Sequence, residues 1–502
     1  MAKENTNANL GFEKQIWDAA CVLWGHIPAA EYRKVIIGLI FLRYISCVFE
    51  KKYRQLVDEG DGFEDDRDAY AEDNVFFVPK EARWSVIASA AHTPEIGNVI
   101  DEAMRAIERE NPVLKNVLPK NYGNPDLEKR VLGDVVDLFT NEIHMDDTEE
   151  SKDLLGRTYE YCIAQFAEVE GTSGGEYYTP ASIVKIIVSI LKPFENCRIY
   201  DPCCGSGGMF VQSEKFLQAH GGRRGHIAVY GQEANADTWK MAKINMAIRG
   251  IDADFGPYHA DTFGHDLHPR LKADFVMANP PFNYHPWGQE NLKNDPRWKY
   301  GLPPSGNANY AWIQHMLYHL APNGKIGLVL ANGALSSTQG GEDEIRKNIV
   351  LDDKVECILS LPTQLFYSVS LPVTLWFFNN SKPNKGKVLF IDARKMGFMA
   401  DRTHKAFTDE EINKLAATYD AYQKGEDVDT DGFCAVKTIS DISKENFILT
   451  PGRYVGANDE IVDDTPVSEK LEKLNGELNE LFSESHTLEE KIIQLLKVAK
   501  DE

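Results

Sequence analysis

The sequence predicts an α/β protein with a mostly parallel sheet, preceded by an all-α domain and followed by a coiled-coil-like helix. Three patterns predict this fold. From about residue 171 onward, short apolar runs alternate with helical stretches, as in βαβ units. Before that point, the chain from about Gly11 to Arg157 shows helical periodicity, including an apolar stretch from Val35 to Val48. After about Asp463, apolar residues recur at heptad spacing.

Six apolar runs are the expected strands of the sheet. The last two are joined by the 362–372 loop, and we expect them to form an antiparallel edge. Ligands of such sheets bind at the carboxyl ends of the strands, so the residues that follow each run are candidates for a functional site. The six runs span residues 198–200, 227–231, 275–278, 325–331, 355–361 and 373–378.

Length and composition fit a globular protein of several domains. At 502 residues, the chain is too long for one ordinary core, and we expect domains at 1–157, 158–455 and 456–502. Apolar residues make up 43% of the chain, but no uninterrupted apolar run reaches the length that spans a membrane. The N-terminus is polar and lacks the apolar core of a signal peptide, so a cytoplasmic location is expected.

The eight cysteines are scattered, without a C-x-x-C pair or the spacing of a zinc site. Reduced and mostly buried thiols are therefore expected, and no metal site is expected. The adjacent Cys203 and Cys204 are interpreted as small residues that fill a tight loop.

The formal net charge is −23. A chain this acidic is repelled by a polyanion unless its basic residues cluster locally. If the substrate is a nucleic acid, a more basic partner subunit is expected to supply much of the grip on it.

An acid and a glycine-rich turn follow the first strand. Asp201 ends the strand, and Gly205, Ser206 and Gly207 form the turn that leads into a helix. Glycines here allow a ligand to approach the backbone closely. Phe210 stands where a dinucleotide-binding fingerprint needs its third glycine, and a phosphate loop would need a lysine that is absent. Because a carboxylate repels phosphate and attracts an ammonium group, the expected ligand is a nucleoside with a cationic amino-acid tail, S-adenosylmethionine.

Two further acids fit the same ligand. Glu233 ends the next strand, where a carboxylate can accept hydrogen bonds from both ribose hydroxyls. Asp261 is interpreted as another strand-end acid, suited to the amino group of the adenine ring. Either acid alone is weak support, since an exposed acid at the end of a strand is common.

Asn279-Pro280-Pro281-Phe282 follows the buried run 274–278 and is the most informative stretch of the chain. Two consecutive prolines cannot continue a strand, so the tetrapeptide is a stiff turn at the carboxyl end of one. The Asn279 side-chain oxygen and the Pro280 carbonyl can each accept one hydrogen from an exocyclic amine. That arrangement draws the nitrogen lone pair out of conjugation with the ring and directs it at an incoming methyl group.

A planar base that carries such an amine also needs a surface to stack on. Phe282 can stack on the face of the base, and Tyr284 and Trp287 are further candidates for the same pocket. In duplex DNA, the base must be flipped out of the helix to reach it. The alternative is a helix-capping Asn in a Pro-rich turn, and the acid and glycine turn upstream outweighs it.

A glycine-flanked aromatic stretch, Gly174 to Pro180, precedes the sheet. Thr179 and Pro180 are interpreted as a helix N-cap and first turn. The stretch can close over the methionine end of the cofactor. The alternative is a plain loop that leads into a helix, and the residues leave both open.

The C-terminal segment carries a coiled-coil seam. It could fold back on its own chain or dock on another subunit, and the pattern leaves both open. The seam positions are Val467, Leu471, Leu474, Leu478, Leu481, Leu488, Ile492 and Leu495.

Together these motifs resemble the modification (M) subunit of type I restriction-modification systems, a group of adenine-specific DNA methyltransferases. The resemblance covers nearly the whole chain, and the cofactor motif precedes the catalytic one, which is the gamma order of amino-methyltransferases. The motifs that carry it are Leu10-Gly11-Phe12-Glu13, Gly175-Glu176-Tyr177-Tyr178-Thr179-Pro180, Asp201-Pro202-Cys203-Cys204-Gly205-Ser206-Gly207-Gly208, Asn279-Pro280-Pro281-Phe282, Leu371-Pro372-Val373-Thr374-Leu375-Trp376-Phe377 and Leu449-Thr450-Pro451-Gly452-Arg453-Tyr454.

The resemblance implies a class I S-adenosylmethionine-dependent methyltransferase fold, Rossmann-like, with a mostly parallel seven-stranded sheet. It implies that Asn279 to Phe282 hold a target adenine in double-stranded DNA, whose N6 amino group is methylated. The implied contacts to S-adenosylmethionine are Glu176, Tyr177, Tyr178, Thr179, Pro180, Ala181, Gly205, Ser206, Gly207 and Glu233.

The resemblance also accounts for the acidic charge. In these systems, a separate specificity (S) subunit reads the DNA sequence, two M subunits bind it, and a restriction (R) subunit can join. The C-terminal seam then becomes a candidate for docking on the S subunit.

Two other functions remain open. A methyltransferase that acts on a glutamine amide or an RNA amine would use the same Asn-Pro-Pro-aromatic turn, because the turn serves any planar amine. The long helical N-terminus and the terminal coiled coil argue against it. The other alternative is an inactive assembly subunit, and the intact acid, glycines and Asn279 argue against that.

Overall fold

The computed structural model divides the chain into two compact units, Met1–Val455 and Gly456–Glu502. Among the residues that it describes, no helix is long and apolar enough to cross a membrane. The predicted C-terminal seam and the Leu10–Glu13 motif lie outside the described residues. The structure describes residues 29–71, 73, 75–141, 179–223, 225–366, 372–400 and 404–456.

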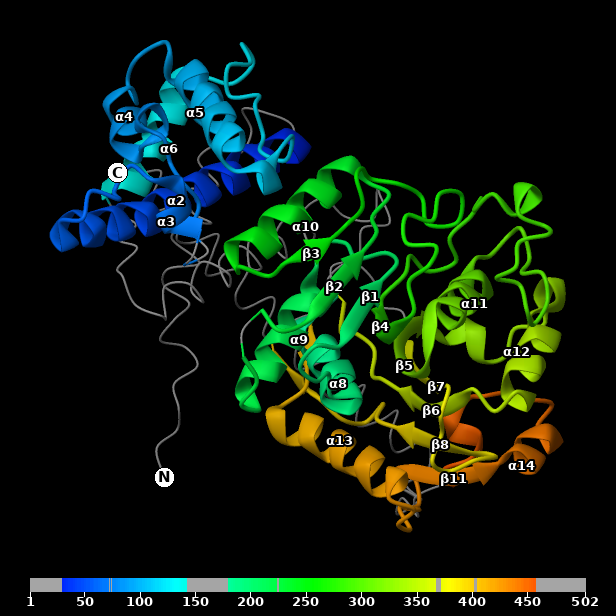
Figure 1. The fold of residues 1–502 in the computed structure, drawn as a ribbon. Coiled ribbons are helices and arrows are strands. Elements are labelled where there is room, and N and C mark those ends of the chain that lie inside the picture. Colours follow the sequence, from blue (N-terminus) through cyan, green and yellow to red (C-terminus); the bar gives the residue numbers. More distant parts are fainter. Residues whose placement is uncertain are drawn as a thin grey trace, which may run out of the picture. The chain divides into compact units, whose positions relative to one another are not determined.

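The N-terminal part of the described chain is built from helices, as expected (Figure 1). The long helix α2 (Ala29–Glu59) contains the predicted apolar stretch, and its residues 35–42 are buried. Helix α5 (Ile96–Glu110) buries a stripe at helical spacing that includes Ile100 and Ile107. The other helices of this part are α3 (Arg67–Ala71), α4 (Trp84–Ser89) and α6 (Lys129–Asn141).

The rest of the described chain forms a nine-stranded sheet in the order β11-β8-β6-β7-β5-β4-β1-β2-β3 (Figure 1). All six predicted runs are strands, whereas β3, β8 and β11 were not predicted. Two short strands, β9 (Phe398–Met399) and β10 (Lys405–Ala406), pair separately. The nine strands are β1 (Arg198–Asp201), β2 (Ala228–Gly231), β3 (Ala253–Asp254), β4 (Ala273–Ala278), β5 (Leu320–Ala331), β6 (Val355–Ser360), β7 (Val373–Asn379), β8 (Lys387–Asp392) and β11 (Cys434–Thr438).

Strands β1 to β7 are the seven expected strands, and β8 and β11 extend the sheet beyond them. β6 and β7 are antiparallel to each other, as predicted, but they do not form an edge. β7 lies between β5 and β6 and is antiparallel to both, and β8 covers the other side of β6. Every residue of β6 and of β7 is buried, as the unbroken apolar runs of interior strands require.

Both faces of the sheet are covered. Along β4, Phe275 and Met277 face one apolar core, and Val276 and Ala278 face the other. Such a doubly covered sheet leaves the carboxyl ends of its parallel strands as the place for a ligand. Helices α8 (Ala181–Leu191), α9 (Gly208–Ala219), α10 (Ala236–Ile248) and α13 (Asp409–Gln423) build the first core, and α11 (Asn309–His319), α12 (Glu342–Leu351) and α14 (Ile439–Lys444) build the second.

Candidate active site

The carboxyl ends of three neighbouring parallel strands carry the predicted functional residues. β1 lies between β2 and β4, with Asp201 opposite Gly231 of β2 and Tyr200 opposite Val276 of β4. Asn279 directly follows β4. The acid–glycine turn and the Asn-Pro-Pro-Phe turn therefore open on the same edge of the sheet.

The turn after β1 uses the conformational freedom of its glycines. Gly205 (φ +53°) and Gly207 (φ +84°) both adopt left-handed backbone conformations. A Cβ at Gly205 would meet nothing within 4 Å, whereas a Cβ at Gly207 would lie 2.8 Å from Cε of Met246. Nδ2 of Asn245 in α10 donates to the Ser206 carbonyl (2.6 Å) and holds the turn in place. The space beside Gly205 is left open for a ligand.

Asp201 is buried at the start of this turn, with 2% of its surface exposed. Burial raises the pKa of Asp201 to about 7, and the negative charge of Glu233 adds to the rise. The backbone N–H of Cys203 donates to Oδ1 of Asp201 (3.0 Å) and partly opposes it. A bound cation would therefore convert this carboxyl group to its charged form.

Glu233 lies two residues beyond β2 and connects two elements of the site. Its Oε2 accepts from the N–H of Gly205 (3.1 Å), and its Oε1 accepts from the N–H of Asn235 (2.8 Å), which is the N-cap of α10. A carboxylate oxygen has more than one acceptor site, so this geometry remains compatible with bonds from ribose hydroxyls.

Asp261 is not at the end of a strand, and that prediction was wrong. β3 ends at Asp254, because the chain turns at Gly256 (φ +70°), and Asp261 lies in the loop that follows. The loop nevertheless returns to the site, since the N–H of Ala260 donates to the Glu233 carbonyl (2.9 Å).

The amide of Asn279 is oriented by a residue far away in the sequence. Its Nδ2 donates to Oγ1 of Thr179 (3.0 Å). Its Oδ1 is buried and has no hydrogen-bond partner among the residues that the structure describes. A buried oxygen without a partner costs about 1–3 kcal/mol, so this arrangement favours a ligand that brings a donor. The free atom is the one expected to accept from the target amine.

Thr179 and Pro180 directly precede α8, which begins at Ala181. The prediction that Thr179 caps this helix was wrong, because the N-cap is Pro180 and no side chain bonds to the first turn. Thr179 is one residue too early for capping, and its hydroxyl bonds Asn279 instead. The other predicted contacts of this stretch, Glu176, Tyr177 and Tyr178, lie outside the described residues.

Phe282 is positioned by a second aromatic ring. It packs edge-on against Phe366, with ring centroids 5.9 Å apart and an interplanar angle of 81°. Pro280 is buried, and Pro281 and Phe282 are half-buried. The aromatic ring therefore lies within the tetrapeptide's own turn, next to the free oxygen of Asn279.

Of the two further aromatic candidates, only Tyr284 lies near the cofactor loop. Burial raises the pKa of Tyr284, and so does the nearby negative charge of Asp261. Trp287 instead belongs to the apolar core: it is 3% exposed and packs against Phe263 with ring centroids 5.2 Å apart. Its apolar body, with only one polar atom, favours that burial.

Three residues that shape the site were not found from the sequence. Gln232 is fully buried and donates to the carbonyls of Ala260 (3.2 Å) and His265 (2.7 Å), which fixes the loop that carries Asp261. Its only signal was a polar residue that directly follows an apolar strand. Asn245 and Phe366 had no signal, because their partners lie far away in the sequence.

The fold and its strand ends define a class of protein. Strands β1 to β7 in the order 3-2-1-4-5-7-6, with β7 antiparallel, form the Rossmann-like sheet of class I S-adenosylmethionine-dependent methyltransferases. In this class, the turn after β1 and the turn after β4 flank the place where the methyl group is transferred.

Comparisons with known proteins give the family. The N-6 DNA Methylase family matches residues 150–463, and the HsdM N-terminal domain family matches residues 12–139. The chain belongs to the N-6 DNA methylase family and, within it, to the methylase subunits of type I restriction enzymes, which methylate adenine at N6 in DNA.

Similar proteins support this at the level of the whole chain. The HindI methylase subunit of Haemophilus influenzae is 46% identical over 83% of this chain and 98% of its own length. The MjaIX methylase subunit of Methanocaldococcus jannaschii is 38% identical over 97% of this chain and 91% of its own. A type I methyltransferase subunit from Streptococcus thermophilus shares the fold, with a TM-score of 0.77 and 23% identity over 89% of this chain and 99% of its own.

Proposed function

We propose that the chain transfers the methyl group of S-adenosylmethionine to the N6 amino group of adenine in duplex DNA, through Asn279, Pro280, Pro281 and Phe282. The observation that carries this assignment is the buried Oδ1 of Asn279, which lacks a partner among the described residues while Nδ2 is bonded to Thr179. An oxygen oriented in this way, at the end of β4, is a fixed acceptor for an amine hydrogen.

The residues at the end of β1 and β2 fit the proposed cofactor. Gly205 leaves open space beside the turn, and Asp201 is a buried carboxyl group that a cationic amino-acid tail would ionise. We assign the ribose to Glu233 and the adenine ring to Asp261. The remaining contacts proposed for the cofactor are Glu176, Tyr177, Tyr178, Thr179, Pro180, Ala181, Ser206 and Gly207. The cofactor supplies an electrophilic methyl group bonded to a positively charged sulfur.

The chain's own residues prepare the amine for that methyl group. Oδ1 of Asn279 and the carbonyl of Pro280 each accept one N6 hydrogen, which makes the nitrogen tetrahedral and releases its lone pair from the ring. The lone pair forms the new C–N bond as the S–C bond breaks, and the extra proton on N6 leaves to solvent. Phe282 stacks on the base, which has been flipped out of the duplex.

The assembly of the chain is part of the proposal. An S subunit supplies sequence specificity, with two copies of this chain for each S subunit, and an R subunit joins where one is encoded. The division into 1–157, 158–455 and 456–502 assigns the last segment to S-subunit docking. The charge of −23 supports this arrangement, because an isolated chain this acidic is repelled by DNA.

The activity is tested on the chain copurified with its partners. The complex is incubated with unmethylated duplex DNA and with S-adenosylmethionine that carries a labelled methyl group, and nucleosides are then analysed by mass spectrometry. We expect the label in N6-methyladenine. Label in RNA or in a glutamine side chain of a protein would overturn the assignment in favour of the second enzyme class. Cofactor binding by calorimetry without any transfer would indicate an inactive assembly subunit.

A further inference from the structure

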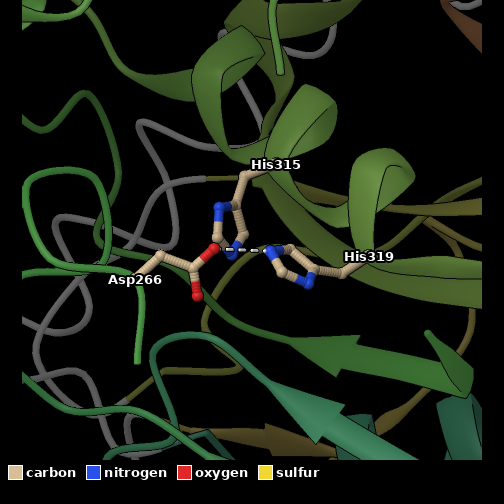
Figure 2. Close-up of side chains that lie close together, drawn as sticks. All are labelled: Asp266, His315 and His319. Atoms are coloured by element: carbon tan, nitrogen blue, oxygen red, sulfur yellow. Dashed lines mark hydrogen bonds and ion pairs between the residues drawn. The ribbon is translucent and has the colours of Figure 1, made fainter. Parts of the chain in front are cut away.

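A buried polar cluster lies against Tyr200 of β1, and the mechanism above does not use it. His315 and His319 stand one helical turn apart on α11 and approach Asp266, as Figure 2 shows. One ligand atom from each of the three lies within 4.8 Å of the others, which is a spacing that a metal ion could use. Both histidines are fully buried.

Hydrogen bonds account for both nitrogens of His315. Nη1 of Arg297 donates to Nδ1 of His315 (3.1 Å). A guanidinium has only donors, so Nδ1 carries the lone pair and the ring proton is on Nε2. Nε2 then donates to the hydroxyl of Tyr200 (3.0 Å). Burial lowers the pKa of His315 well below its usual value, and the positive charges of His319 and Arg297 add to this, so the ring is neutral.

His319 faces an acceptor at each ring nitrogen. Nε2 lies 2.9 Å from Oδ2 of Asp266, and Nδ1 lies 3.2 Å from the carbonyl of Leu271. Burial acts to raise the pKa of Asp266, but the hydrogen bond and charge of His319 outweigh it and hold that pKa below its usual value. The carboxylate is therefore charged, and a ring that donates to both acceptors is an imidazolium. The cluster already contains two cations, a guanidinium and an imidazolium, which disfavour a metal ion.

Arg297 holds the loop that carries Asp261. Its guanidinium donates to the carbonyls of Thr262 (3.1 Å) and Phe263 (2.7 Å), and its charge is balanced by Asp295 (2.7 Å). The hydroxyl of Thr262 in turn donates to the Pro202 carbonyl (2.5 Å), which belongs to the acid–glycine turn. One planar side chain thus fixes two of the segments assigned to the cofactor.

Arg297 comes from the opposite side of the site. It lies in the 283–308 loop, which begins directly after Phe282 and ends at α11. The same loop contains Tyr284, whose pKa is raised by burial and by the charge of Asp261. A change in the loop that carries Asp261 is therefore transmitted to the segment that follows the target-base turn.

We propose that Arg297 is a positioning residue that joins the cofactor loop to the target-adenine loop, with His315 and Tyr200 fixing its orientation, so that binding of cofactor and of DNA are coupled. The inference rests on the function proposed above. Because coupling between two ligands is reciprocal, S-adenosylhomocysteine should tighten DNA binding by the same factor by which DNA tightens its own binding.

The test uses the complete complex with its S subunit and three variants, Arg297→Met, Arg297→Lys and Tyr200→Phe. Calorimetry measures the Kd of S-adenosylmethionine, and DNA affinity is measured with and without S-adenosylhomocysteine. We expect Arg297→Met to weaken cofactor binding about tenfold or more and to abolish the effect of S-adenosylhomocysteine on DNA affinity. Arg297→Lys keeps the charge without the planar fork and should restore only part of the coupling. Tyr200→Phe should fold normally and should weaken the coupling about threefold.

Lys382→Met is the matched control. Lys382 is also a buried cation, 5% exposed, paired with Asp353 (2.6 Å) and bonded to the carbonyls of Val355 (2.8 Å) and Lys387 (2.6 Å). It lies away from the site, so its removal should lower Tm like the Arg297 variant but leave cofactor affinity and coupling unchanged.

Two results would overturn the inference. One is a wild-type complex that methylates adenine while Arg297→Met and Tyr200→Phe keep full cofactor affinity and coupling. The other is one equivalent of a transition metal per chain by elemental analysis, which is lost in His315→Asn. Absence of adenine methylation by the wild-type complex would instead reject the proposed function itself, so the two failures can be told apart.

Discussion

Asn279 has one half of its amide occupied and the other half free. Nδ2 is bonded to Thr179, whereas Oδ1 is buried without a partner in the described part of the chain. If the amide were rotated by half a turn, a donor would face the target amine and repel it. At the residue scale, Thr179 therefore acts on the reaction through Asn279.

Replacing Thr179 by Val removes the acceptor for Nδ2 while keeping the shape of the side chain. We expect kcat to fall about tenfold, which corresponds to about 1.4 kcal/mol, because the amide loses its fixed orientation. Thr179→Ser should restore the rate. Steady-state methylation and cofactor Kd are measured together. A rise in cofactor Kd with unchanged kcat would show that the hydroxyl serves the cofactor and not Asn279.

Asp201 makes cofactor binding depend on pH. Its pKa is about 7 in the free chain because it is buried, so below pH 7 the carboxyl group is mostly protonated. The cationic tail of the cofactor prefers the charged form. We expect cofactor affinity to fall about tenfold per pH unit below pH 7, measured by calorimetry between pH 5.5 and 7. Asp201→Asn should bind weakly with no slope in this range, and a wild-type affinity that is independent of pH would contradict this role.

The same shift affects stability with the opposite sign. The folded chain holds the Asp201 proton up to about pH 7, whereas the unfolded chain releases it near its ordinary pKa of about 4. This contribution to the free energy of unfolding is fully present below about pH 4 and is lost as pH rises to about 7. Bound cofactor should therefore raise Tm more at pH 7.5 than at pH 5.5.

At the scale of elements, the site depends on turns that glycine permits. Gly205 and Gly221 both have positive φ (+53° and +82°), and at both a Cβ would meet nothing within 4 Å. They differ in place: Gly205 precedes α9 beside Asp201, and Gly221 follows α9 on the surface. The pair therefore separates backbone strain from loss of a binding space.

Gly205→Ala and Gly221→Ala should each lose about 1–2 kcal/mol of stability, because an alanine in the left-handed region is strained. Only Gly205→Ala should lose cofactor affinity, since its methyl group would occupy the open space. Thermal melts and calorimetry measure the two effects. Equal cofactor affinities in the two variants would exclude a close approach of the cofactor at Gly205.

The sequence predicted the elements better than their connections. The long apolar runs identified six strands because buried strands require unbroken apolar residues. The two-residue β3 was too short to show a pattern, which is also why Asp261 was misplaced at a strand end. The edge prediction for β6 and β7 failed because β8 and β11 follow them in the chain and extend the sheet. Contacts such as Thr179 to Asn279 join residues 100 positions apart and have no local signal.

At the scale of the whole molecule, charge and docking decide whether the site meets DNA. The chain has a formal net charge of −23, so it needs a partner to hold a polyanion. The apolar heptad seam after Asp463 is the segment that we propose for that partner, and it lies outside the described residues.

Two lysines in the seam, Leu474→Lys with Leu478→Lys, should abolish copurification with the S subunit, because a charge in a coiled-coil core opposes association. The cofactor Kd of the variant chain should stay unchanged. Pull-down with tagged S subunit and calorimetry measure the two properties. Normal copurification would assign S-subunit docking to another surface of the chain.

The most direct measurement of the central claim is methyl transfer to duplex DNA by the complex carrying Asn279→Ala. Asn380→Ala is the control, since its amide bonds the Ala321 carbonyl (2.9 Å) at the opposite end of β5. The account predicts that Asn279→Ala binds S-adenosylmethionine normally but transfers no label to adenine, whereas Asn380→Ala keeps the activity. Transfer at the wild-type rate by Asn279→Ala would contradict the account.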